Sequence, residues 1–103
     1  MNFTEVGLNQ KKVSIGLPVF NEEKLIRKKL ESILSQTFQD FTIVISDNGS
    51  TDQTRKICEE ISKMDDRITF FHHKENKEAY WNFNFVLNKA ETKYFVMAAP
   101  DDI

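Results

Sequence analysis

Acidic side chains follow two of the apolar segments in this sequence. Asp47 comes directly after the run Phe41–Ser46, and the pair Asp101-Asp102 comes shortly after the run that begins at Tyr94. A carboxylate at position 47 could accept hydrogen bonds from a ring N–H or from ribose hydroxyls, and paired carboxylates supply the oxygen ligands that Mg²⁺ or Mn²⁺ prefers. Both sites could equally be plain turns, because Asp-Asn-Gly and Asp-Asp are common in turns. These residues alone leave nucleotide and metal binding open.

Phe20 and two histidines are further candidates. Phe20 lies just beyond the apolar run Val13–Pro18, where its ring could stack on a base or pack under the next helix. His72 and His73 invite a metal site, but neighbouring side chains of an extended strand point to opposite faces, so both could not readily bind one ion. We therefore interpret the two histidines as the end of a strand.

Three aromatic residues, Trp81, Phe83 and Phe85, could form a stacking surface. No basic patch is interleaved with them, which argues against nucleic-acid binding. Phe83 falls on a helical apolar face and is predicted to pack in the core. Asn82 and Asn84 flank it, and either could reach a site from the start of its helix.

Hydrophobic periodicity predicts the helices that position these residues. The first helix is expected to be capped by Asn21, to carry Glu22 and Glu23 in its first turn and to run to about Gln36. The second follows Ser50–Gln53, which has the spacing of a capping box. The predicted apolar stripes of the three helices are Leu25, Ile26, Leu30, Ile33 and Leu34; Thr54, Ile57, Cys58, Ile61 and Met64; and Ala79, Tyr80, Phe83, Val86, Leu87 and Ala90.

Four buried strands alternate with these helices, which predicts an α/β fold with a mostly parallel sheet and helices on both faces. Ligands bind such sheets beyond the carboxyl ends of the strands. The segments that leave the first, second and fourth strands are Pro18–Glu22, Asp47–Ser50 and Pro100–Asp102, and we expect them to meet in a site. The predicted strands are Val13–Pro18, Phe41–Ser46, Ile68–His72 and Tyr94–Ala99.

Length and composition limit the class of protein. The chain has 103 residues and fits one domain, predicted at residues 13–103, with residues 1–12 as a leader or extension. A net charge of −2 provides no broad cationic field, so a small molecule is a better partner than nucleic acid. Cys58 is the only cysteine, which excludes an internal disulfide and suggests a buried thiol. The absence of a long apolar run or a secretory signal predicts a cytoplasmic protein.

Three segments in this order resemble the signatures of family 2 glycosyltransferases: VSIGLPVFNEE, VISDNGSTDQT and YFVMAAPDD. The resemblance extends from Lys12 to Ile103. It implies a truncated GT-A, Rossmann-like fold that corresponds to the amino-terminal, nucleotide-sugar-binding portion of the family.

The resemblance also implies roles for particular residues. Pro18, Val19 and Phe20 would line a base pocket, Glu22 would lie near the nucleotide or stabilise its loop, and Asp47, followed by Asn48, would bind the nucleotide. Asp101 and Asp102 would hold Mn²⁺ or Mg²⁺ on the diphosphate. Two positions depart from the usual family pattern: Ala99 replaces the first metal-motif aspartate, and Asn48 replaces the second aspartate of Asp-Asp-Gly-Ser.

Family members of this type invert the anomeric carbon when an acceptor hydroxyl displaces the nucleotide. The resemblance therefore implies transfer from a nucleotide sugar, with a UDP-sugar favoured, to a glycan or other hydroxyl acceptor in glycan biosynthesis. The catalytic base is expected beyond Ile103, so this chain is expected to be inactive alone. Membrane association of a longer protein and homo-oligomers through uncovered surface are further expectations.

Two other functions remain open from the sequence. A dinucleotide-binding redox domain would share the fold, but the glycines Gly7, Gly16 and Gly49 do not form a Gly-x-Gly-x-x-Gly loop after the first strand. A non-catalytic α/β module could bind a partner through an open sheet edge.

Overall fold

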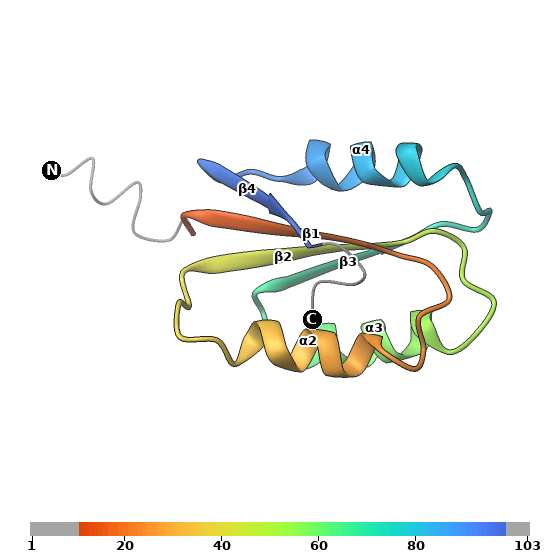
Figure 1. The fold of residues 1–103 in the computed structure, drawn as a ribbon, viewed down its shortest axis with the longest axis horizontal. Coiled ribbons are helices and arrows are strands. Elements are labelled where there is room, and N and C mark those ends of the chain that lie inside the picture. Colours follow the sequence, from red (N-terminus) through yellow and green to blue (C-terminus); the bar gives the residue numbers. More distant parts are fainter. Residues whose placement is uncertain (1–10, 99–103) are drawn as a thin grey trace, which may run out of the picture.

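The computed structural model describes residues 11–98, which form a parallel sheet of four strands covered by helices on both faces. Figure 1 shows α2 and α3 on one face and α4 on the other. The α/β fold predicted from the sequence is confirmed. Its elements are β1 (Val13–Val19), α2 (Ile26–Leu34), β2 (Phe41–Asp47), α3 (Thr54–Met64), β3 (Ile68–His72), α4 (Ala79–Lys89) and β4 (Tyr94–Met97).

The strand order is β3-β2-β1-β4, and every pair is parallel. The order reverses beside β1, because the chain moves outward from β1 through β2 to β3 and then returns to place β4 on the other side. In open α/β sheets this reversal leaves a crevice at the carboxyl ends of the strands. The predicted site therefore belongs beyond β1 and β4.

The larger hydrophobic core lies between the sheet and the α2–α3 layer. Alternate residues of β1 and β2 face this layer, as the two-residue period of a strand requires. Cys58 of α3 is fully buried here, as predicted, and burial raises the pKa of its thiol to about 12. The buried apolar residues of this cluster are Leu17, Val19, Ile26, Leu30, Phe41, Ile43, Ile45, Cys58, Ile61 and Ile68.

The opposite face of the sheet is more polar and packs more closely against α4. Gly16 lies here, and a Cβ atom at this position would come within 2.5 Å of the Phe95 ring and 3.2 Å of the Val86 side chain. A glycine in a strand interior commonly marks such a close approach. No helix within residues 11–98 has the length and apolar character needed to cross a membrane.

The predicted start of the first helix is wrong. Asn21 has a φ of 49°, in the left-handed region, and α2 begins only at Ile26. The carboxamide oxygen of Asn21 accepts hydrogen bonds from the backbone N–H groups of Thr51 (2.8 Å) and Asp52 (3.3 Å). Asn21 thus connects two loops and does not cap the helix.

The capping box predicted at Ser50–Gln53 is also wrong. The Gln53 N–H donates to a Glu23 carboxylate oxygen at 2.9 Å, and the Ser50 hydroxyl donates to Asp47. Asp52 supplies the local acceptor instead, because one of its carboxylate oxygens accepts from the Thr54 N–H at 2.9 Å and from the Thr54 hydroxyl at 2.6 Å.

The apolar stripe predicted for the third helix is largely wrong. The buried residues of α4 are Asn82 and Val86, whereas Tyr80, Phe83 and Leu87 are exposed. Of the stripes predicted for the first two helices, Leu25, which lies just before α2, and Met64 of α3 are likewise exposed. When a helix is apolar on several sides, the periodicity of its apolar residues does not predict which side is buried.

Candidate functional site

Hydrogen bonds join the loop after β1 to the loop after β2. The Asn21 N–H donates to the Ser50 hydroxyl at 2.8 Å, and the Glu22 N–H donates to the Thr54 hydroxyl at 2.7 Å. The Asn48 N–H donates to the Val19 carbonyl at 2.9 Å, extending the parallel pairing of β1 and β2 past the end of β2. The two sequence motifs therefore form one structural unit, as predicted.

A cavity of about 350 Å³ opens beside this unit, between the carboxyl ends of the strands and the first turn of α4. Its lining includes five of the six predicted nucleotide-binding residues. Sequence reasoning missed most of the wall supplied by α4 and β4. The lining residues are Pro18, Val19, Phe20, Glu22, Asn48, Ala79, Asn82, Phe83, Met97 and Ala98.

Two phenyl rings give the cavity an aromatic character. Phe20 is 43% exposed and Phe83 is 42% exposed, although both line the cavity. The prediction that Phe83 packs in the core is therefore wrong. Exposed aromatic rings at a cavity can stack on a planar or partly apolar ligand.

Asp47 does not line this cavity. It shares one face of β2 with Ile43 and Ile45, because side chains two residues apart in a strand point the same way. The side chain is buried, and its carboxylate accepts hydrogen bonds from the Ser50 hydroxyl and from the Ser50 N–H. Burial raises the pKa of the Asp47 carboxyl above its usual 3.8, against the opposing effect of the Ser50 bonds.

Asn48 lines the cavity, but its amide is already bonded. The Asn48 side-chain N–H donates to the Lys77 carbonyl at 2.7 Å, and its side-chain oxygen accepts from the Lys77 N–H at 2.8 Å. The Asn76 side chain donates to the Asn48 carbonyl at 3.0 Å. Asn48 therefore fastens the segment before α4 to the end of β2.

Glu22 both lines the cavity and stabilises its loop. One carboxylate oxygen lies 3.5 Å from the Lys29 ammonium, and the Lys29 side chain is only 3% exposed. A buried lysine needs such a partner, because an unpaired charge is costly away from water. Lys29 was not identified from the sequence, since its position among the charged residues of α2 resembles that of a solvated lysine.

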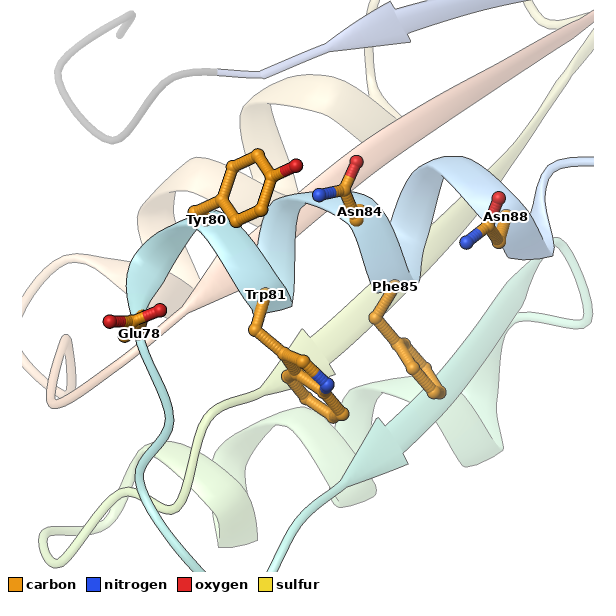
Figure 2. A pocket seen from close by; sticks show the side chains of 6 residues that line it. All are labelled: Glu78, Tyr80, Trp81, Asn84, Phe85 and Asn88. Atoms are coloured by element: carbon orange, nitrogen blue, oxygen red, sulfur yellow. The ribbon is translucent and has the colours of Figure 1, made fainter.

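The two candidate asparagines of α4 lie in different places. Asn82 lines the cavity at the strand ends, whereas Asn84 lines a second cavity of about 380 Å³ on the outer side of α4. Figure 2 shows this second cavity, with the Trp81 and Phe85 side chains next to each other and Tyr80 on another side of the helix. The rings of Trp81 and Phe85 are stacked with centroids 5.5 Å apart.

The histidines form the strand end that the sequence predicts. His72 is the last residue of β3, and His73 follows it. The Nε2 atom of His73 lies 2.8 Å from the Ser46 hydroxyl oxygen, and its ring makes edge contacts with Trp81 and Phe85. Burial lowers the pKa of the His73 imidazole below its usual 6.5.

Residues 11–98 contain no group of three or more His, Cys, Asp or Glu side chains arranged to hold a metal ion. The predicted metal ligands Asp101 and Asp102 lie outside the described residues. The described part of the chain thus offers no metal site that could replace the predicted one.

Comparisons with known proteins agree with the sequence motifs and the fold. The family model "Glycosyl transferase family 2" matches residues 14–103. Glycosyltransferase GlyA of Streptococcus pneumoniae is 37% identical over 91 residues, covering 88% of this chain and 13% of that protein. The GalNAc(5)-diNAcBac-PP-undecaprenol beta-1,3-glucosyltransferase of Campylobacter jejuni is 34% identical over 92 residues, with coverages of 88% and 30%.

Solved structures show the same fold. The crystal structure of S. aureus TarS 1-349 in complex with UDP matches with a TM-score of 0.76 and 29% identity, covering 84% of this chain and 26% of that one. The mannosyltransferase PcManGT from Pyrobaculum calidifontis matches with a TM-score of 0.71 at 24% identity, with coverages of 82% and 26%, and supports the fold alone.

The chain spans less than a third of the length of these curated relatives. Within that span the family model covers both loops of the site and continues beyond β4. The fold matches the family's GT-A structures, with the same parallel sheet and helices. This chain belongs to glycosyl transferase family 2.

Proposed function

We propose that this chain binds the nucleotide of a nucleotide-diphosphate sugar in an inverting glycosyltransferase, with a UDP-sugar as the favoured donor. The observation that carries the proposal is the cavity at the strand ends, which is lined by Pro18, Val19, Phe20, Glu22 and Asn48. All five come from the two motifs that resemble the family signatures. Its position at the reversal of strand order is where α/β sheets bind ligands.

The chemistry of the cavity suits a nucleoside. Phe20 and Phe83 offer exposed rings for stacking on a base, and Pro18 and Val19 offer an apolar floor. Polar contacts would come from backbone groups and from Glu22. The choice of UDP is supported by TarS, whose crystal structure at 29% identity contains UDP.

The remaining steps of transfer are assigned to residues outside the described part. We propose that Asp101 and Asp102 hold Mn²⁺ or Mg²⁺, a cation that would neutralise charge on the departing diphosphate. A base beyond Ile103 would activate the acceptor hydroxyl of a glycan or related molecule. The described part of the chain is expected to bind the donor nucleotide.

Titration calorimetry tests the proposal directly. We expect UDP to bind the chain more tightly than GDP, dTDP or NAD, and Mn²⁺ to increase the affinity. Phe20→Ala should weaken UDP binding by about tenfold, because base–aromatic stacking contributes roughly 1–3 kcal/mol. Phe38→Ala is the matched control, since Phe38 is 49% exposed but does not line the cavity, and it should leave the affinity unchanged.

Two results would contradict the proposal. A well-folded sample that binds none of these nucleotides would leave a non-catalytic module as the function of the chain. Binding of NAD alone would favour a dinucleotide-binding redox domain. The proposed base contact of Asp47 would add a hydrogen bond to a carboxylate that already accepts from Ser50, and equal UDP affinity in Asp47→Asn would remove Asp47 from the site.

A further inference from the structure

A polar cluster is buried between α4 and the carboxyl end of β2. Asn82 is 3% exposed and Ser46 is fully buried. The Ser46 hydroxyl donates to the Asn82 side-chain oxygen at 2.6 Å, and the Asn82 side-chain N–H donates to the Ser46 carbonyl at 2.9 Å. This pair of bonds ties one residue of the helix to both the side chain and the backbone of one residue of the strand.

The hydrogen-bond directions in this cluster determine the proton position on His73. The Asn82 amide nitrogen must face the Ser46 carbonyl, so the amide oxygen faces the hydroxyl and can only accept. Ser46 therefore uses its single hydroxyl proton on Asn82. The remaining partner of the hydroxyl is Nε2 of His73 at 2.8 Å, which must be the donor. Neutral His73 is thus the Nε2–H tautomer.

The cluster lies at the wall of the proposed nucleotide cavity. Asn82 itself lines the cavity, together with Ala79 and Phe83 from the same turn of α4. Glu78, the residue that caps α4, makes no side-chain capping bond, so the start of this helix is held mainly by its contacts with the sheet and the preceding segment. His73 adds a contact from the next strand, because its ring packs edge-on against Trp81 with centroids 4.8 Å apart.

We propose that Asn82 is a positioning residue for the donor nucleotide. Its amide, bonded to Ser46 and through Ser46 to His73, sets the distance between the first turn of α4 and the carboxyl end of β2. That distance determines how far Phe83 and Ala79 lie from Phe20 across the cavity. The inference rests on the proposed function, since it assigns the cluster to the same nucleotide cavity.

Variants of the cluster and a matched control test this role through the affinity for UDP. Asn82→Ala should weaken UDP binding by about tenfold, and Ser46→Ala by a similar factor, because each leaves buried polar groups without partners and lets α4 shift. Ser14→Ala is the control: Ser14 lies on the same face of the sheet, is equally buried and bonds Thr92 at 2.7 Å, but it lies at the amino end of β1.

Ser14→Ala should lower the free energy of unfolding as Ser46→Ala does, while changing the UDP affinity by less than about twofold. All affinities are measured where urea titration shows each variant to be fully folded. The positioning role is wrong if the parent binds UDP and the two variants, Asn82→Ala and Ser46→Ala, bind it with the same affinity as the parent. Equal weakening by Ser14→Ala would also overturn it, because the effect would then follow stability alone.

Nitrogen-15 NMR of the His73 ring supplies a readout that stability does not control. The parent should show the Nε2–H tautomer at neutral pH, and Ser46→Ala should lose the signature of a hydrogen-bonded Nε2–H. An Nδ1–H tautomer in the parent would overturn the assigned network. A parent that shows the network but binds no nucleotide would instead overturn the proposed function, so the two failures are distinguishable.

Discussion

Asp47 occupies the most unusual chemical environment among the carboxylates of the site. It is buried beside apolar residues of β2, and its hydrogen-bond partner is the backbone and hydroxyl of Ser50. Ser50 in turn accepts from the Asn21 N–H. A single carboxylate thus supports both loops of the site, whether or not it also contacts a base.

The pKa of Asp47 gives a testable dependence of stability on pH. Because burial raises this pKa in the folded state, the folded protein holds the Asp47 proton to a higher pH than the unfolded chain does. The free energy of unfolding therefore loses a contribution as pH rises from about the unfolded value of 3.8 through the raised folded value. Asp47→Asn, which does not titrate, should lack this loss.

Urea unfolding of both proteins between about pH 3 and pH 7 measures the effect as a difference. The parent should become less stable relative to Asp47→Asn as pH rises above about 3.8, until the pH exceeds the raised pKa of the folded state. Asp52 and Asp65 have lowered pKa values and act in the opposite direction, but they are present in both proteins and largely cancel. A difference in the free energy of unfolding that stays constant with pH would show that burial does not raise the pKa of Asp47.

At the scale of elements, the start of α2 depends on a charge pair more than on a cap. The residue before α2 makes no side-chain capping bond, and the preceding turn is closed by the Glu22 carbonyl, which accepts from the Ile26 N–H at 2.8 Å. The Glu22 carboxylate then pairs with Lys29 from within the helix. Loop and helix are therefore joined by one residue.

Lys29→Met should lower the free energy of unfolding by about 2 kcal/mol, because it keeps the apolar stem but leaves Glu22 partly buried without its cation. Arg55→Met is the matched control. Arg55 pairs with Glu59 at 3.4 Å on the surface of α3, where both side chains are well exposed, and its loss should cost less than about 0.5 kcal/mol. Equal costs in urea titration would mean that burial adds nothing to the Glu22–Lys29 pair.

The sequence predicts strands better than helix boundaries, and the reason is physical. Each strand carries a short apolar run, and the structure contains all four. The start of α2 depends on Asn21 reaching Thr51, a contact between residues 30 positions apart that no local pattern contains. In α4 the buried Asn82 bonds Ser46 of β2, 36 positions away, while Phe83 is exposed, and no local pattern contains that contact.

The site was predicted at the correct edge of the sheet, but one predicted residue, Asp47, does not line the cavity. Asp47 is the last residue of β2 and faces the α2–α3 layer with Ile43 and Ile45, whereas the cavity opens toward α4. The two-residue period of β2 was the available signal, because it places Asp47 on the same face as the apolar Ile43 and Ile45. The walls from α4 and β4 could not be read from the motifs, because they depend on the strand order.

On the scale of the whole molecule, α4 and β4 expose an unusual amount of apolar surface. Tyr80, Phe83 and Leu87 of α4 and, on the opposite face of the sheet, Tyr94 and Val96 of β4 are each at least 42% exposed. Within residues 11–98, β4 is also at the edge of the sheet. Exposed apolar side chains beside an open strand edge favour association with another chain. We therefore expect the 103-residue chain to form dimers or larger species as its concentration rises.

Sedimentation velocity over a range of concentrations tests this expectation. Leu87→Lys and Val96→Lys should each shift the chain toward monomer, since a charge at a contact surface must be desolvated, while the partial exposure of both side chains lets the fold tolerate the change. Met64→Lys is the control, because Met64 is 79% exposed on α3, which packs over β2 and β3 at the far side of the sheet from β4, and it should leave association unchanged. Association that responds equally to all three substitutions would reflect net charge, and the exposed side chains of α4 and β4 would not be its cause.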